Sequence, residues 1–456
     1  MKRQLSWRDY QESLQRSALR KRRLSRAGIG LAIFAVLAAF GHGLIGLPFI
    51  KKSDEGAPSQ MPGRKSVAYP SDNLLDKKAV KAILENNAAV DATGKHFEFS
   101  TGNDDYIVTT TFDESLQDFI KRKIDTRTAR YIGIVVTDPF TGKIIAMANY
   151  DRTDSAGVLC AENRFPAASV FKIITAAAVI ERFDFNERKK IAYNGKKHTL
   201  YKSQLKNQNN RYTNWVTLKE AFATSINPVF GKLGALYLKK DILEQYAMEF
   251  GFNTAIDFEL PLSMSEFTVR DNAYQWAEIA SGFNRITKIT PLHGALIAGT
   301  VINGGKLMEP FIIEAISNDE GRLVYAGSPR RVKQAISENT ARIVQVLMSA
   351  TINTGTCRKT FRGYGRDRVL SRLDMGGKTG SIDNASHDVR LDWFVGYARD
   401  KAGNGCIGAS IFVAHEKYIG TRASQYAKII FKHYFSDYFA GKKTSGGIPE
   451  ASAKLS

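Results

Sequence analysis

The longest uninterrupted apolar segment of the chain lies near its start. Residues 27–50 contain no Asp, Glu, Lys or Arg, and a helix of that length crosses a bilayer core of about 30 Å. Nine basic residues against two acidic ones precede it in residues 1–26, and segments rich in Lys and Arg stay on the cytoplasmic side. The pattern predicts a basic cytoplasmic tail, 1–26, and a single transmembrane anchor, 27–50, with the rest of the chain outside.

A cleaved signal peptide is the alternative interpretation of this segment. Ala39, Phe40 and Gly41 resemble a small-x-small cleavage site. The basic lead is long, however, and apolar residues continue past that site as far as Ile50. Both features favour an anchor that is retained.

Two patterns of β-branched and apolar residues, one early and one late, predict β-hairpins. Residues 131–150 form two such runs around the turn sequence DPFTG, 138–142. Residues 393–397 and 407–414 flank a second turn segment, 400–405. A further strand is predicted at 106–111.

Between the hairpins the apolar residues recur mainly at helical spacing. A Thr217/Glu220 capping box starts a helix at 218–223, and Thr290 caps a helix at 291–302 that has proline at its first position. Further helices are predicted at 74–85, 113–124 and 426–438. The helix at 426–438 is expected to pack against the sheet.

Strands at both ends with helices between them predict an α+β fold: an antiparallel β-sheet flanked by helices, with an inserted all-helical subdomain. A cleft between the sheet and the insertion is the natural place for a site. Composition divides the remaining chain into a juxtamembrane linker with a short N-terminal region, 51–104, a main domain, 105–440, and a disordered tail, 441–456.

The net charge of the chain is +20 at pH 7. A basic excess is common in nucleic-acid-binding proteins, but a domain outside the membrane does not meet nucleic acid. An anionic membrane surface or an acidic polymer is the more natural partner. Basic residues concentrate in 188–211, where a solvated loop face is the simplest interpretation.

The three cysteines lack the spacing of a zinc site or of a disulfide framework, so no metal centre is predicted. Cys406 lies in an apolar strand-like run and is expected in the core. A Cys160–Cys357 disulfide stays open as a possibility at this point.

One lysine interrupts the apolar segment FPAASVFKIITAAAVIERF, residues 165–183. Ser169, Lys172 and Thr175 are the only polar residues from 169 to 180, and their spacing of three places them on one stripe of a helix. Burying an amine without a partner is costly. Lys172 must therefore reach the surface, form an ion pair or take part in chemistry.

A serine hydroxyl attacks poorly until a neighbouring group takes its proton, and lysine can do so when burial and a nearby cation keep its amine neutral. A second lysine, Lys378, lies in the Gly-flanked strand MGGKTGS, 375–381. The triplet Ser225-Ile226-Asn227 lies between two helical segments, since the following proline restricts Asn227.

In this order, S-x-x-K, S-x-N and K-T-G are the signature of penicillin-binding proteins and class A β-lactamases. The segments DPFTGKIIAM, ITPLHGALIAGTVINGG and DWFVGYA are also similar to penicillin-binding proteins. Over residues 105–438 the chain resembles a penicillin-binding protein with a D,D-transpeptidase domain. The resemblance implies the fold shared by β-lactamases and transpeptidases.

The resemblance also implies residue roles. Ser169 is the acylated nucleophile and Lys172 its general base. Ser225 relays a proton to the leaving D-alanine nitrogen, and Asn227 binds the donor peptide and supports Lys172. The positive charge of Lys378 lowers the pKa of Lys172.

The strand that follows Lys378 is expected to bind substrate through Thr379, Gly380 and Ser381, the two hydroxyls holding the terminal carboxylate. The backbone N–H groups of Ser169 and Ser381 form the oxyanion hole. Relatives more often have threonine where this chain has Ser381, which retains the hydroxyl but leaves substrate preference open.

The implied function is that of a serine D,D-transpeptidase in the bacterial cytoplasmic membrane. It cross-links peptidoglycan stem peptides ending in D-Ala-D-Ala outside that membrane, without a cofactor, and is acylated by β-lactam antibiotics. Other cell-wall synthesis proteins are possible partners. Residues 51–104 are too few for a glycosyltransferase domain, so no glycan polymerisation is expected.

Three other functions share the motifs. A D,D-carboxypeptidase uses water in place of the amine acceptor, and a β-lactam sensor or scaffold is acylated without efficient turnover. Residues 1–26 are short for a signalling domain, which argues against a sensor. A class A β-lactamase needs an additional glutamate; the nearest candidate, Glu249, is interpreted as structural. His387 and His415 are interpreted as surface or core histidines.

Overall fold

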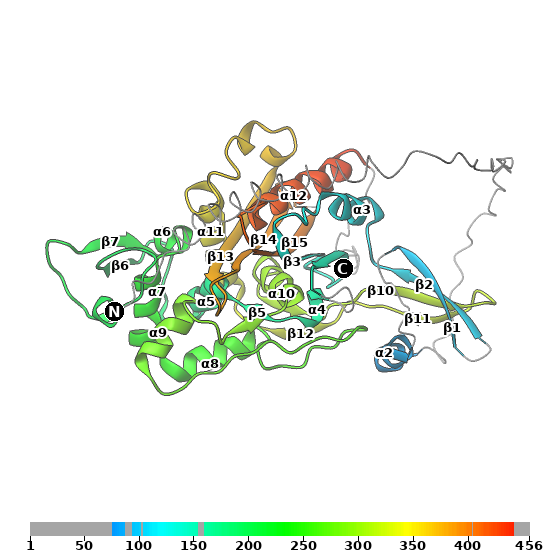
Figure 1. Ribbon diagram of the computed structural model, residues 1–456, viewed down its shortest axis with the longest axis horizontal. Helices are drawn as coiled ribbons and strands as arrows, with labels where there is room; N and C mark the ends of the chain where they lie inside the picture. Colours follow the sequence, from blue (N-terminus) through cyan, green and yellow to red (C-terminus); the bar gives the residue numbers. More distant parts are fainter. Residues whose placement is uncertain (1–74, 87–93, 102–103, 154–158, 404, 442–456) are drawn as a thin grey trace, which may run out of the picture. The chain divides into compact units, whose positions relative to one another are not determined.

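The computed structural model describes residues 75–86, 94–101, 104–153, 159–403 and 405–441 (Figure 1). The predicted cytoplasmic tail, the predicted membrane anchor 27–50, most of the linker and residues 442–456 lie outside this set. Within it, no helix combines the length and the apolar character needed to cross a bilayer. The anchor therefore stays a prediction.

A five-stranded antiparallel sheet carries the site. Its strands, in spatial order, are β13 (Leu373–Asp383), β14 (Arg390–Asp400), β15 (Cys406–His415), β3 (Ala129–Thr137) and β4 (Ile144–Asp151). Both predicted hairpins are confirmed as β3–β4 and β14–β15. In the first turn Gly142 has φ +86°, and a Cβ there would lie 2.1 Å from the Glu309 carbonyl oxygen. Only glycine fits this turn.

Helices cover both faces of this sheet (Figure 1). On one face α10 (Pro291–Ile302), with Thr290 as its N-cap, packs against β14, β15 and β3. On the other, α12 (Ala423–Phe439) packs against β14 and β15, and α3 (Glu114–Lys123) against β4. Successive side chains of a strand point to opposite faces of the sheet. On β14, Trp393 therefore packs in the hydrophobic core on the α10 side, and Phe394 packs in the core on the α12 side. The predicted packing of the C-terminal helix on the sheet is confirmed.

The segment between β4 and β13 contains most of the helices. They are α4 (Leu159–Glu162), α5 (Lys172–Phe183), α6 (Leu218–Ala223), α7 (Asn227–Lys232), a π-helix (Leu233–Leu238), α8 (Lys239–Glu249), α9 (Ala273–Ser281), α10 and α11 (Glu338–Asn353). Short 3₁₀ turns occur at Ala168–Phe171, Lys202–Leu205, Tyr364–Arg366 and Leu370–Arg372. The predicted capping box of α6 is confirmed, since Thr217 and Glu220 bond reciprocally.

The prediction of an all-helical insertion is wrong. The insertion also contains strands, namely β5 (Phe165–Pro166), β6 (Lys190–Tyr193), β7 (Asn214–Thr217), β8 (Lys288–Ile289), β9 (Lys306–Met308), β10 (Ile313–Asn318), β11 (Leu323–Ala326) and β12 (Arg331–Gln334). They pair as β5–β8, β6–β7, β9–β12 and β10–β11. Most of these strands have two to four residues, too few for an alternating pattern to be recognised in the sequence.

A second sheet connects the N-terminal part to the main domain. Its order is β1 (His96–Thr101), β2 (Asp104–Thr110), β10 and β11. The helix predicted nearby is confirmed as α2 (Lys77–Asn86). Lys77 Nζ donates to Glu309 Oε1 at 2.8 Å and to the Pro310 carbonyl oxygen at 2.9 Å, so α2 is fixed to the segment that leads into β10.

The open possibility of a Cys160–Cys357 disulfide is excluded, because all three cysteines are free and buried. Cys160 packs in the core beneath β1 and β2, whereas Cys357 packs in the core under α12. Burial raises the pKa of both thiols to about 12. Cys406 lies in the core, as predicted.

Candidate active site

A cavity of about 470 Å³ lies beside β13. Residues from six separate parts of the chain line it: Ser169, His198, Ser225, Asn227, Gly282, Phe283, Arg285, Thr356, Thr379, Ser381, Ile382, Asp383, His387 and Arg390. Five of them, Ser169, Ser225, Asn227, Thr379 and Ser381, are site residues that the sequence predicts. The fold thus brings the three sequence motifs to one cavity.

Ser169 lies in a 3₁₀ turn, Ala168–Phe171, and not in the α-helix that the apolar pattern predicts from residue 169. The α-helix α5 begins only at Lys172. Ala168 has φ +47°, which an α-helix cannot accommodate, and Gly282, distant in the sequence, lies directly against its carbonyl group. The tight turn leaves the Ser169 side chain at the cavity while the residues that follow it are buried.

The amine of Lys172 is bound on three sides by oxygen atoms. Nζ lies 2.7 Å from Ser169 Oγ, and it donates to Asn227 Oδ1 at 2.8 Å and to the Ser281 carbonyl oxygen at the end of α9. Lys172 has no exposed surface, and these described partners are all neutral. The surface and ion-pair interpretations of this lysine are therefore excluded within the described part of the chain.

Burial holds the pKa of Lys172 well below its usual value of 10.5, and the nearby positive charge of Lys378 lowers it further. A neutral amine 2.7 Å from a serine hydroxyl can accept the hydroxyl proton. The pair has the geometry of a nucleophile and its base.

The Ser225–Asn227 turn joins α6 to α7 and faces Lys172. Ser225 has φ +58°, a left-handed conformation that is strained for serine. The orientation of the Asn227 side chain is fixed by a hydrogen bond, because its Nδ2 donates to the His198 carbonyl oxygen at 3.1 Å. Its Oδ1 is thereby directed at the Lys172 amine.

Lys378 lies on β13 with no exposed surface. Its Nζ donates to Ser225 Oγ at 3.0 Å and to the Thr379 carbonyl oxygen at 2.9 Å. Burial lowers the pKa of Lys378 to about 7. The two lysines therefore contact the two serines in matching pairs, Lys172 with Ser169 and Lys378 with Ser225.

Beyond Lys378, β13 is the edge strand of its sheet and forms one wall of the cavity. The Thr379 hydroxyl lies 2.6 Å from the Thr356 hydroxyl, and Ser381 is exposed. Gly380 is buried where the strand approaches the Ser169 turn: a Cβ there would lie 3.1 Å from the Ala167 carbonyl oxygen. An exposed strand edge can pair with an extended peptide.

Several cavity residues were missed from the sequence. His198, Thr356, Arg285, Asp383 and Arg390 belong to no motif, and no periodic or compositional signal singles them out. Burial and the charges of Lys172 and Lys378 lower the pKa of His198. His387, interpreted as a surface or core residue, is exposed but lines the cavity, while His415 is in the core.

Glu249 lies outside the cavity lining and forms an ion pair with Lys333 at 3.3 Å. Its interpretation as a structural residue agrees with this contact. Of the described glutamates, none lines the cavity.

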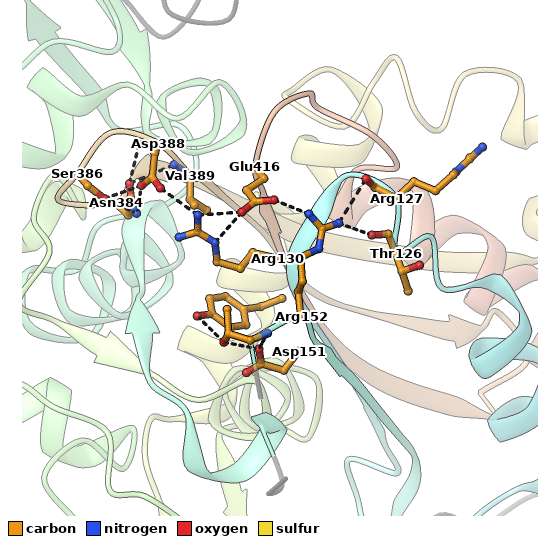
Figure 2. Close-up of polar contacts among 12 residues, drawn as sticks. Thr126, Arg127, Arg130, Asp151, Arg152, Asn384, Ser386, Asp388, Val389 and Glu416 are labelled. Carbon is orange, nitrogen blue, oxygen red and sulfur yellow. Dashed lines mark hydrogen bonds and ion pairs between the residues drawn. The ribbon is translucent and has the colours of Figure 1, made fainter. Parts of the chain in front are cut away.

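The turn between β13 and β14 is fixed at the cavity mouth by a charged network (Figure 2). Asp388 accepts from Arg130 at 2.9 Å, from Asn384 at 2.7 Å and from Ser386. Arg130 also donates to Glu416 at 2.9 Å, and Glu416 pairs in turn with Arg152. Hydrogen bonds from Ser386, Asn384 and Arg130 hold the pKa of Asp388 well below its usual value.

A family model described as the penicillin binding protein transpeptidase domain matches residues 132–436. Among curated proteins, Stage V sporulation protein D of Bacillus subtilis is 26% identical over 360 residues, covering 73% of this chain and 53% of that protein. Peptidoglycan D,D-transpeptidase PbpA of Mycolicibacterium smegmatis is 24% identical over 304 residues, covering 58% of each chain. The chain therefore spans about half the length of these two relatives.

Solved structures agree on the fold. The D,D-transpeptidase domain of a peptidoglycan glycosyltransferase from Eggerthella lenta has a TM-score of 0.62 and 22% identity, covering 82% of this chain and 93% of that one. PBPA from Mycobacterium tuberculosis has a TM-score of 0.58 and 20% identity, covering 72% of this chain and 80% of that one. These likenesses confirm the predicted α+β architecture.

Proposed function

Because the chain belongs to the penicillin-binding protein transpeptidase family, we propose that it is a serine D,D-transpeptidase that cross-links peptidoglycan stem peptides through an acyl-enzyme on Ser169. The observation that carries this proposal is the contact of a buried amine, Lys172, whose pKa is lowered by burial, with the Ser169 hydroxyl in a cavity lined by all three motifs.

In the first step, Ser169 Oγ attacks the carbonyl carbon of the D-Ala-D-Ala peptide bond while Lys172 takes the hydroxyl proton. The backbone N–H groups of Ser169 and Ser381 stabilise the resulting oxyanion. The C–N bond then breaks, and the proton that Lys172 took passes through Ser225, whose hydroxyl contacts Lys378, to the D-alanine nitrogen. Lys172 is then free to accept a proton again. The products are D-alanine and an ester on Ser169.

In the second step, an amine from another stem peptide attacks this ester and loses a proton to Lys172, which returns a proton to Ser169 Oγ as the ester C–O bond breaks. Thr379 and Ser381 hold the carboxylate of the donor peptide in this scheme, and Gly380 lets β13 approach the Ser169 turn. A β-lactam undergoes only the first step. When its ring opens, the nitrogen stays attached to the acyl group, so no fragment leaves the site and the acceptor amine has no room to attack. We therefore expect stable acylation by penicillin.

We also propose that residues 27–50 anchor the chain in the bacterial cytoplasmic membrane, with 1–26 inside and 105–440 outside. The apolar run and the basic lead support this arrangement. Membrane lipids and other cell-wall synthesis proteins are the partners that follow from it. Residues 51–104 then lie between the membrane and the enzyme, and 441–456 form a tail.

Covalent labelling tests the proposed function. Fluorescent penicillin is expected to form a stable adduct with the full-length protein in detergent, and peptide mass spectrometry is expected to find it on Ser169. A donor peptide ending in D-Ala-D-Ala, incubated with an amine acceptor, should release D-alanine and yield the cross-linked product.

Other outcomes would contradict it. An adduct on another residue, or none on folded protein, would exclude the assigned nucleophile. Rapid release of hydrolysed penicillin would indicate a β-lactamase. Release of D-alanine with no cross-linked product at high acceptor concentration would indicate a D,D-carboxypeptidase.

A glycine variant tests how strictly the Ser169 turn is positioned. A Cβ at Gly282 would lie 1.9 Å from the Ala168 carbonyl oxygen and 2.9 Å from the Ser169 amide nitrogen. Since displacing a reacting group by 1 Å can cost about 10²-fold in rate, Gly282→Ala should slow acylation by penicillin by roughly that factor. The second-order rate of fluorescent labelling measures it.

Gly363→Ala is the matched control. Gly363 has φ +80°, comparable with +66° at Gly282, but no atom lies within 4 Å of its Cβ position. Both variants carry the same left-handed strain, and only one clashes with the Ser169 turn. Equal labelling rates in the two variants would show that the turn tolerates displacement.

A further inference from the structure

The cavity has a charged end that the proposed reaction does not use. Arg285, Arg390 and His387 line it there, and Asp383 is the one acidic side chain in the described lining. Arg285 comes from the loop after α9. Asp383 ends β13, Arg390 begins β14, and His387 lies in the turn between them. Two guanidinium groups against one carboxylate leave this end positive.

Both arginines retain donors for a ligand. Arg285 Nε donates to the Asp383 carbonyl oxygen at 2.8 Å, and Arg390 Nη1 donates to Asp383 Oδ1 at 2.7 Å. A guanidinium carries five N–H donors, so one contact each among the described residues uses only part of this capacity. Arg285 is exposed, and the Arg390 side chain is 28% exposed.

The groups at this end are held in place before any ligand binds. The turn that carries His387 is fixed through Asp388, which accepts from Arg130, Asn384 and Ser386 (Figure 2). Asp383 pairs with Arg390 across the β13–β14 ladder as well as through their side chains. A site that is already ordered loses little conformational entropy on binding.

The charged end of the cavity lies further along β13 than the residues proposed to bind the substrate carboxylate. Asp383 lies two residues beyond Ser381, or about 7 Å along a strand. A donor peptide paired with this edge strand, with its terminal carboxylate at Thr379 and Ser381, would bring the residue before its D-alanines close to Asp383. That residue's side chain would then face the two arginines.

We propose that Arg285 and Arg390 form a subsite for an acidic side chain, binding the carboxylate of the donor residue that precedes D-Ala-D-Ala. The subsite rests on the proposed transpeptidase function and adds the substrate class to it. Arginine suits this role, because its planar donors match a carboxylate in two parallel hydrogen bonds.

Two donors that differ in one group test the subsite. Both are peptides ending in X-D-Ala-D-Ala, where X is diaminopimelate in one and the same residue with its side-chain carboxylate amidated in the other. Charged hydrogen bonds are strong enough that the wild type should release D-alanine from the donor with the free side-chain carboxylate about 10-fold faster, as kcat/KM. Full-length protein in detergent is used throughout.

In Arg285→Gln and in Arg390→Gln, the ratio of the two kcat/KM values should fall to about 1–3. The ratio is taken within each variant, so a general loss of activity cancels. Arg285 is exposed, which makes misfolding of its variant the lesser concern. In the control Arg127→Gln the ratio should stay at its wild-type value, since Arg127 is exposed and pairs with Asp125 outside the cavity.

Equal rates with the two donors in the wild type would overturn the subsite while leaving the transpeptidase proposal intact. An unchanged ratio in both arginine variants would do the same. A wild-type protein that reacts with neither donor nor penicillin would instead overturn both proposals together.

Discussion

Replacing Lys172 with methionine is expected to abolish labelling of Ser169 by penicillin about as completely as Ser169→Ala does. We expect a fall of about 10³-fold or more in the acylation rate, because a nucleophile and its base act as one unit. The amine is the group that contacts Ser169 Oγ at 2.7 Å. Methionine keeps the length of the side chain and removes the proton acceptor.

The fold should survive this change. Lys172 has no exposed surface, and replacing a buried polar group with an apolar one of similar volume often leaves stability unchanged or higher. Circular dichroism and the thermal midpoint of unfolding check this. Without them, loss of labelling could reflect unfolding.

Lys232→Met is the matched control for Lys172→Met. Lys232 is also buried, its Nζ donates to the Ala192 carbonyl oxygen at 2.9 Å, and burial lowers its pKa. It does not line the cavity. The control should be labelled within about threefold of the wild-type rate, whereas labelling of Lys172→Met at a comparable rate would exclude Lys172 as the base.

The second large effect is expected from Lys378→Met, which should lose activity and gain stability. The charge of Lys378 helps to lower the pKa of Lys172, and its Nζ contacts Ser225 Oγ. Removing it should slow acylation by roughly 10²–10³-fold. Burying this amine, however, is unfavourable for folding.

The pH dependence of stability follows from the pKa of Lys378, which burial lowers to about 7 from a usual value of 10.5. Between these two pH values the unfolded chain binds a proton at this site that the folded protein does not. This site therefore makes the free energy of unfolding rise with pH across that range, and its destabilising effect is complete below pH 7. Removing the amine should stabilise the protein most at pH 7 and less at pH 9.

Thermal unfolding of wild type and Lys378→Met at pH 7 and pH 9 measures this difference. At pH 7 the variant is expected to be more stable, by on the order of 1–4 kcal/mol, and its advantage should shrink at pH 9. A variant less stable than the wild type at pH 7 would show that the amine supports the fold. An advantage that grows with pH would contradict the lowered pKa.

Much of the fold could be predicted because its signals are local. The turn sequence at 138–142 and the caps at Thr217 and Thr290 act within a few residues, and all three appear where the sequence places them. The long helix α12 follows from a repeat of apolar residues, and α10 from its cap and its first-position proline. The short strands of the insertion give no such repeat, and for this reason the all-helical prediction failed.

The start of α5 marks the limit of local reasoning at the site. Apolar periodicity predicts one continuous helix from Ser169, but the structure has a 3₁₀ turn there. The left-handed Ala168 and the close approach of Gly282 define that turn, and Gly282 is far away in the sequence. A pattern of residue types carries no information about such a contact.

The sequence alone determined which groups this protein has for chemistry: a serine with a lysine three residues later, a second serine with an asparagine, and a second lysine on a Gly-flanked strand. It also determined the hairpins β3–β4 and β14–β15 and most of the longer helices, since local spacing decides these elements. The tertiary structure alone decided that Lys172 has three oxygen partners and no surface, and that Lys378 contacts Ser225. It also decided that Arg285 meets the end of β13. Burial and long-range contact set the pKa values and the charge of the cavity, and these depend on how distant segments pack.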